Sequence, residues 1–233
     1  MYILYKKELG YYLNNAIGYI IVVLFGVFAN FLFVKDLFVI GTASMQTFFS
    51  ILPWLCMVFI PAMSMRIISE EKRTNTIETL LTLPVSETQI VLSKFLALVT
   101  LLIVSLVLTV SLPVSLSYLS GLYIPETIVG YIGTICMGAS FIAISMYFSS
   151  QTKNQVIAFL LSVIVLFLLI VLHTDFMSTV LPKSILDYAI LFSPAYHFQN
   201  FIKGVIDIRS VFYFAGVAGI FLFLTITDLE KRR

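Results

Sequence analysis

Six long stretches without a single Asp, Glu, Lys or Arg dominate this sequence of 233 residues. They cover residues 9–34, 37–65, 95–125, 127–152, 154–174 and 210–227. Each can supply the roughly 20 apolar residues with which a helix crosses about 30 Å of hydrocarbon. The chain is therefore predicted to be an all-α, polytopic membrane protein with six transmembrane helices. Their apolar cores are placed at 16–34, 48–65, 95–116, 128–148, 156–172 and 211–225.

The composition supports this class and excludes another. Apolar residues make up 60% of the chain and charged residues 11%, whereas a soluble domain carries about 25% charged residues. The 14 basic and 12 acidic side chains are too dispersed to form the basic face that binds phosphates. The lipid bilayer is the expected surrounding, and nucleic acid is excluded as a partner.

Basic residues near the span ends predict the orientation, because loops rich in Lys and Arg stay in the cytoplasm. One side holds Lys6, Lys7, Arg66, Lys72, Arg73, Lys94, Lys153, Lys231, Arg232 and Arg233. The other side holds only Lys35, Lys183, Lys203 and Arg209. Both termini of this multi-pass protein are thus predicted to be cytoplasmic. The loop at 66–94 is then cytoplasmic and the loop at 173–210 extracytoplasmic.

Two further helices are predicted outside the spans. Four residues share one helical face at the start of the chain: Tyr2, Tyr5, Leu9 and Tyr12. They predict an interfacial helix over residues 1–14, with a frayed terminus as the alternative. The apolar segment 188–202 is too short to cross, so it is predicted to lie in the interface or to re-enter the membrane.

Catalytic and metal-binding patterns are missing from the sequence. Cys56 and Cys136 are 80 residues apart with no Cys or His at ligand spacing, and no Gly-x-x-x-x-Gly-Lys-Ser/Thr nucleotide-binding run occurs. The six apolar cores also contain no Asp, Glu, Lys, Arg or His, the groups with which ion-coupled carriers bind their ion. The chain is predicted to be no enzyme, to hold no metal or cofactor, and to take its driving force from another protein.

Two sets of small or polar residues fall inside the spans. Gly130, Thr134 and Gly138 recur every four residues, which permits close helix packing against a neighbour in this chain or in a second copy. The third span carries the candidate pathway-lining residues Ser105, Thr109, Ser111 and Ser115. Alternatively, these hydroxyls bind carbonyls of their own helix, including the carbonyl that Pro113 leaves without a donor.

The cytoplasmic loop concentrates the charge that the rest of the chain avoids. The second span is expected to continue as a helix through 66–73 and to end at Asn75 in the left-handed conformation. Asn75 and Glu78 have the spacing of a capping box, and an apolar edge followed by Pro84 predicts a short helix after it. Such a helix fits a groove of a cytosolic partner. The alternative, a helix resting on lipid, is disfavoured by the carboxylates Glu70, Glu71 and Glu78, which anionic headgroups repel.

Three segments carry a family resemblance. They are Glu71-Lys-Arg-Thr-Asn-Thr-Ile-Glu-Thr-Leu-Leu-Thr-Leu-Pro-Val-Ser86, Ser193-Pro-Ala-Tyr-His-Phe-Gln-Asn-Phe-Ile-Lys-Gly-Val-Ile-Asp-Ile-Arg209 and Lys7-Glu-Leu. Together they resemble the ABC-2 type transporter permeases, near the branch with the permease of the gliding-motility ABC transporter. Asn75 stands where that family usually has Gly, and both residues suit a left-handed turn.

The resemblance implies one transmembrane permease domain over residues 1–233 of an ATP-driven exporter, located in a bacterial cytoplasmic (inner) membrane. A second copy or a related permease would complete the pathway, and a separate ABC ATPase subunit would bind ATP and Mg. An accessory membrane protein of gliding-motility type is a further implied partner. The N-terminal helix would brace the ATPase contact. The implied coupling residues are Glu70, Glu71, Asn75, Thr76, Glu78, Leu80 and Leu81, and the implied outer gate comprises Phe198, Phe201 and Ile202.

Two other functional classes stay open on the sequence alone. A stand-alone carrier or channel is disfavoured because the spans offer no charged site for an ion. A membrane scaffold of a motility or secretion complex overlaps the permease if transport has been lost. A neighbouring reading frame with a nucleotide-binding motif would favour the permease. The apolar and hydroxyl side chains of the suggested pathway fit a hydrophobic or amphiphilic cargo.

Overall fold

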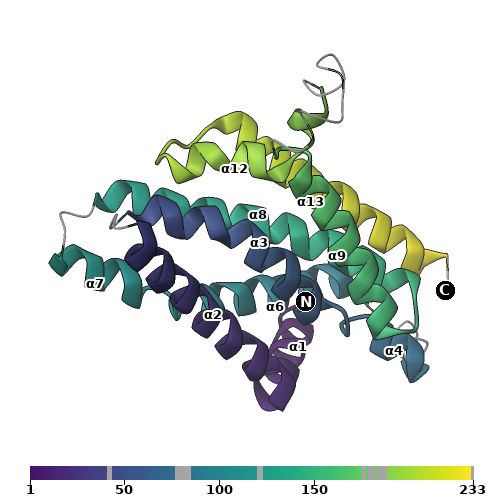
Figure 1. Ribbon diagram of the computed structural model, residues 1–233. Coiled ribbons are helices and arrows are strands. Elements are labelled where there is room, and N and C mark those ends of the chain that lie inside the picture. Colours follow the sequence, from purple (N-terminus) through teal and green to yellow (C-terminus); the bar gives the residue numbers. More distant parts are fainter. Residues whose placement is uncertain are drawn as a thin grey trace.

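The computed structural model describes residues 1–40, 44–76, 85–119, 123–174, 177, 182 and 188–231, and its regular elements are all α-helices (Figure 1). In chain order they are α1 (Tyr2–Asn14), α2 (Ala16–Ile40), α3 (Met45–Ser64), α4 (Ser69–Arg73), α6 (Glu87–Val107), α7 (Ser111–Leu119), α8 (Ile124–Gln151), α9 (Gln155–Val171), α12 (Pro194–Ile202) and α13 (Ile208–Glu230). The predicted all-α class is confirmed.

Five helical stretches among the described residues are long and apolar enough to cross a membrane. They are formed by α2, by α3 with α4, by α6 with α7, by α8 and by α13, while α9 is apolar but has only 17 residues. The polytopic membrane class is therefore confirmed. The count of six spans, with α9 as the sixth, stays a prediction.

The central helix of the bundle is α8, which packs against α3, α6, α9, α12 and α13. Small residues allow this close packing. A Cβ built on Gly130 would lie 2.3 Å from the Phe49 ring of α3, and one on Gly138 would lie 2.3 Å from Leu102 Cδ2 of α6. Thr134 between them is fully buried and donates a hydrogen bond to the Gly130 carbonyl. The neighbours of this stripe lie in the same chain.

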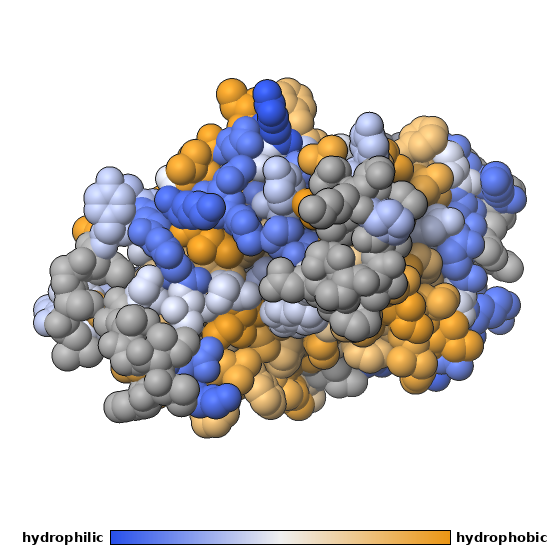
Figure 2. Space-filling model, turned by 45° about the horizontal axis from the view of Figure 1, so that its top comes forward, coloured by the Kyte–Doolittle hydropathy of each residue, from blue (hydrophilic) through white to orange (hydrophobic). Residues whose placement is uncertain are grey.

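The outer surface is apolar where a membrane would contact it. On the face drawn in Figure 2, hydrophobic areas lie mostly in the lower half, below a hydrophilic region. The span of α2 is only 28% buried and that of α13 only 17%, against 61% for α8. One copy of the chain thus leaves the apolar faces of α2 and α13 largely open to lipid or to another membrane protein.

The helix is interrupted between α6 and α7, around Thr109, which lies four residues before Pro113. Because Pro113 has no N–H, the Thr109 carbonyl loses its usual donor, and it accepts instead from the amide of Leu112 at 3.1 Å. The Thr109 hydroxyl donates to the Leu106 carbonyl and lies 3.0 Å from the Tyr131 hydroxyl of α8. The backbone, rather than a hydroxyl, therefore satisfies the carbonyl that the proline leaves open.

Candidate functional site

The chain bends sharply between α3 and α4. The sequence predicts that the second span continues as a helix through 66–73. Met45–Arg73 does form one helical stretch, but a turn at 65–68 interrupts it between the end of α3 at Ser64 and the start of α4 at Ser69. Ser149, at the end of α8, explains the bend. Its hydroxyl accepts from the amides of Ile68 at 3.3 Å and Ser69 at 3.1 Å and lies 3.0 Å from the Met65 carbonyl. One side chain thus satisfies the backbone groups that the bend exposes.

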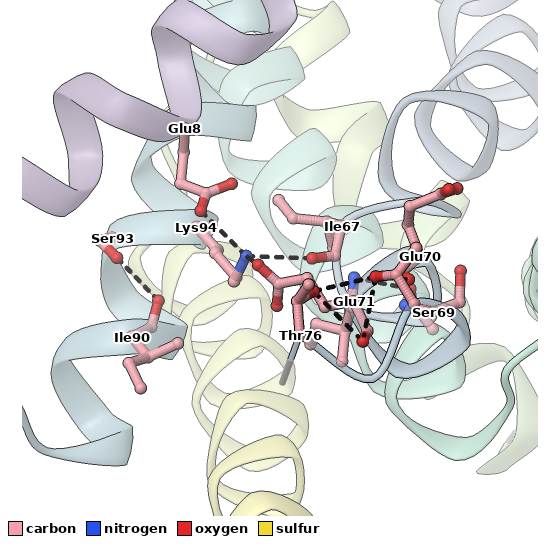
Figure 3. Close-up of polar contacts among 12 residues, drawn as sticks. Glu8, Ile67, Ser69, Glu70, Glu71, Thr76, Ile90, Ser93 and Lys94 are labelled. Atoms are coloured by element: carbon pink, nitrogen blue, oxygen red, sulfur yellow. Dashed lines mark hydrogen bonds and ion pairs between the residues drawn. The ribbon is translucent and has the colours of Figure 1, made fainter. Parts of the chain in front are cut away.

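Lys94, near the start of α6, is the centre of a buried ionic cluster (Figure 3). Its side chain is 2% exposed, and Nζ lies 3.0 Å from Glu8 Oε1 of α1 and 2.7 Å from Glu71 Oε1 of α4. The Ile67 carbonyl, at 3.1 Å, takes the third N–H. A buried ammonium is tolerated only when all three donors are used. Lys94 therefore joins α1, α4 and α6.

A second buried lysine, Lys72, fixes the other side of α4. Its Nζ lies 3.0 Å from Asp228 Oδ2, near the end of α13, and also donates to the Ser150 carbonyl at the end of α8. Lys72 follows Glu71 directly in the sequence, but the two side chains contact opposite sides of the bundle. The five-residue helix α4 is thus held between α1 and α6 on one side and α8 and α13 on the other.

Two tyrosines of α1 hold this helix against the bundle. The Tyr12 hydroxyl donates to the Met63 carbonyl at 2.9 Å, and the Tyr5 hydroxyl lies 3.0 Å from Thr100 Oγ1 of α6. Burial, reinforced by the negative charge of Glu8, raises the pKa of the Tyr12 phenol well above its usual range. The phenol therefore keeps its proton and stays a donor at every physiological pH.

The exposed side of α4 leads directly into the segment with the predicted coupling helix. Glu70 pairs with Arg73 at 2.6 Å and with Arg66 at 3.5 Å. Asn75 has a φ of 56°, which confirms the predicted left-handed turn. Thr76 places its hydroxyl 2.9 Å from that of Thr74. Residues 77–84 lie outside the described residues, and with them the predicted coupling residues Glu78, Leu80 and Leu81.

A cleft of about 300 Å³ opens between α1 and the turn around α4. Its lining combines the cluster carboxylates with a rim of tyrosine, threonine and basic side chains. The lining residues are Lys7, Glu8, Tyr11, Tyr12, Arg66, Ile67, Glu70, Glu71, Thr74 and Thr76. The structure thus brings the predicted residues Glu70, Glu71 and Thr76 together with α1.

The predicted outer-gate residues lie on α12. Phe198 and Phe201 are completely buried and Ile202 is half-buried. Phe201 fills the space beside Gly133 of α8, where a Cβ would come within 2.4 Å of the phenylalanine side chain. The helix is therefore packed into the bundle by two aromatic side chains.

The four candidate pathway residues do not share one surface. Ser105 and Thr109 are fully buried, whereas Ser111 and Ser115 are exposed. Ser105 donates to the Leu101 carbonyl and Ser115 to the Ser111 carbonyl, both one turn earlier in their own helices. These hydroxyls satisfy the helix backbone in the structure.

Sequence reasoning missed the charged residues at the centre of the site: Glu8, Lys72, Lys94 and Asp228. One signal was available for Glu8, which lies three residues after Tyr5 and four before Tyr12 and so belongs to the same helical face. Lys94 was assigned to the loop end, although the apolar run that begins at Phe95 follows it directly.

The fold is that of a polytopic α-helical membrane protein. Its candidate site is a cluster of buried, paired charges at one end of the helix bundle. The family model described as ABC-2 family transporter protein matches residues 35–229. Because the match spans most of the chain, the chain belongs to the ABC-2 family of transporters and is a membrane permease component, the non-catalytic part of such systems. A comparison with curated proteins found no significant match. Its place near the gliding-motility branch stays a prediction.

Proposed function

We propose that this permease is the membrane subunit of an ATP-driven exporter and is moved by a separate ATPase subunit that docks on the segment after α4. A second copy or a related permease would complete the pathway. The observation that carries the proposal is the double attachment of α4, through Glu71 to Lys94 and through Lys72 to Asp228. A force on the segment after Asn75 would reach both sides of the bundle at once.

The physical nature of these attachments suits such a role. Buried charge-assisted hydrogen bonds are short and directional, so they resist displacement better than apolar contacts, which slide. Lys94 also reaches α1 through Glu8, so the N-terminal helix would move together with α4. The open apolar faces of α2 and α13 leave room for a second permease in the membrane.

The direct test is to purify the tagged chain from its native membrane under mild conditions and to identify its partners by mass spectrometry. An ABC ATPase subunit is the expected companion, and the complex in proteoliposomes should hydrolyse ATP. A chain that moves solute against a gradient in the absence of an ATPase would instead be a stand-alone carrier and would overturn the proposal.

Replacing Glu78 with lysine is expected to strongly reduce recovery of the ATPase subunit with the tagged permease. The substitution reverses the charge of the predicted capping residue in the docking helix. Membrane insertion should be unchanged, because the residue belongs to the cytoplasmic loop. Glu230→Lys is the matched control, since it makes the same charge change at an exposed position at the end of α13. Equal ATPase recovery from both variants would reject docking through Glu78.

A cysteine appended after Arg233 is expected to react with an impermeant thiol reagent only after the cytoplasmic membrane is permeabilised. The excess of Lys and Arg on that side of the spans is the reason. A cysteine replacing exposed Tyr188 on the opposite side should react in intact spheroplasts, in a background without the two native cysteines. Labelling of the C-terminal position in intact spheroplasts would reverse the proposed topology.

A further inference from the structure

A narrow apolar cleft of about 220 Å³ lies between α9 and α13. Both helices pack on α8, which supplies the floor of the cleft with Phe141 and Ile144. Val165 and Leu169 form the α9 wall, and Val217 and Phe221 form the α13 wall. These six side chains are apolar, and they belong to helices that a membrane would surround. The remaining α8 residue of the lining, Ser140, is buried and donates its hydroxyl proton to the Met137 carbonyl of its own helix.

The end of the cleft near α12 is polar. Tyr213 lines the cleft one turn before Val217, and its hydroxyl donates to the Phe192 carbonyl. The His197 ring stacks on the Tyr213 ring, with centroids 4.1 Å apart and an interplanar angle of 18°. Arg209 is exposed and precedes Tyr213 by four residues, so it continues the same side of α13 beyond the rim. The cleft is therefore apolar along its length and aromatic at its mouth near α12, and the cationic Arg209 lies one helical turn from Tyr213, outside the lining.

The volume and the lining of the cleft limit what can bind there. A helix is about 10–12 Å wide with its side chains and cannot enter a cleft of this volume, so a helix of a second copy could only cover it. Most of the lining is apolar, and the Ser140 hydroxyl already donates to the Met137 carbonyl, so water would gain few hydrogen bonds there. An empty cleft would forfeit the dispersion contacts of its lining. A linear hydrocarbon chain suits the volume and the chemistry of the cleft.

We propose that the cleft between α9 and α13 binds one acyl chain of an anionic phospholipid from the surrounding membrane. The phosphate would lie at the mouth, where Arg209 supplies a guanidinium, the side chain best suited to phosphate. Tyr213 would lie at the boundary between headgroup and chain, where amphipathic rings are favoured. The proposal is independent of ATPase docking, which involves the opposite end of α13.

The test uses the purified protein complex in vesicles that contain a phosphatidylglycerol with a photoreactive group in its acyl chain. After irradiation, mass spectrometry of peptides is expected to find the label on α9 and α13 residues of the cleft. Val217→Trp fills the cleft from one wall and should abolish this labelling. Leu169→Phe fills it from the other wall and should reduce it, so the result does not depend on one variant folding. Ala215→Trp, at an exposed position of α13, should leave labelling unchanged.

A second experiment tests whether the site prefers an anionic headgroup. Phosphatidylglycerol should displace the photoreactive lipid more effectively than phosphatidylcholine, and Arg209→Gln should remove this preference while labelling persists. Labelling of the cleft that survives both Val217→Trp and Leu169→Phe would overturn the site. So would crosslinks from these residues to a second copy of the chain, which would make the cleft a protein interface. Equal competition by both lipids in the unmodified protein would overturn the anionic headgroup.

Discussion

Replacing Lys94 with methionine is expected to lower the free energy of unfolding by about 3 kcal/mol, because it leaves the carboxylates of Glu8 and Glu71 buried without their cation. This figure is at the low end for a broken buried pair, since the Glu71 side chain keeps 21% of its surface exposed. The loss should appear as a lower unfolding temperature of the purified protein in detergent. It should also expose α1 to protease, because Glu8 attaches that helix to the bundle.

Two comparisons isolate the ionic cluster as the cause. Lys6→Met removes the same charge from an exposed position of α1 and should change stability by less than about 0.5 kcal/mol. Combining Lys94→Met with Glu8→Gln and Glu71→Gln should recover much of the lost stability, because no uncompensated charge then stays buried. If the triple variant were less stable than Lys94→Met alone, unpaired carboxylates would not be the source of the loss.

The second large effect is expected from Gly133→Ala, at about 1–3 kcal/mol of destabilisation. The added methyl group would lie 2.4 Å from both Cβ and Cγ of Phe201, and Cβ is fixed by the α12 backbone, so no side-chain rotation removes this contact. The helix α12 should therefore shift outward. Denaturation of the purified protein measures the cost, and an increase in the reactivity of a cysteine placed at Ile202 reports the shift.

The other glycines provide a graded control for this prediction. The methyl group of Gly138→Ala would clash with Leu102 Cδ2, the end of a flexible side chain, while Ile60 Cδ1 at 3.4 Å and Leu102 Cγ at 3.5 Å are at ordinary contact distance, so this variant should cost less. Gly216→Ala has no atom within 4 Å of the new methyl group and should cause no loss. Equal stability of the Gly133→Ala and Gly216→Ala variants would show that Phe201 does not pack on α8 in the membrane.

Much of the helix pattern could be predicted, because local chemistry determines it. Uncharged intervals locate the long helices, and short polar side chains mark several of their starts. Ser86, Asn154 and Asp207 each accept a hydrogen bond from an amide in the first turn of α6, α9 and α13. The left-handed turn at Asn75 belongs to the same group of local signals.

The ionic cluster could not be predicted in this way, because its members meet only after the bundle has packed. Glu8 is 86 residues before Lys94, and Lys72 is 156 residues before Asp228. The bend before α4 depends likewise on Ser149, which is about 80 residues further along the chain. Periodicity within one helix carries no information about such partners.

The four hydroxyls suggested as a pathway lining on the third span do not form one surface, and the helical repeat already indicates this. Ser105 and Thr109 are one turn apart and share a face, but Ser111 is only two residues after Thr109 and falls on the other side of a helix, with Ser115 one turn further on. In the structure the first two side chains are buried and the last two are exposed, and the helix is also interrupted between Val107 and Ser111. A proline signals that a helix is interrupted, but the new direction depends on packing.

The interruption between α6 and α7 also divides this crossing into two helical rods that differ in how firmly they are held. The α6 rod is anchored by Lys94 to α1 and α4, whereas the α7 rod is joined to it through a few i to i+3 hydrogen bonds around Thr109. We therefore expect the α7 rod to change its tilt more easily than the α6 rod, which keeps its ionic contacts. In that case the crossing would widen at the end of the bundle away from Lys94 and remain closed at the end that holds it.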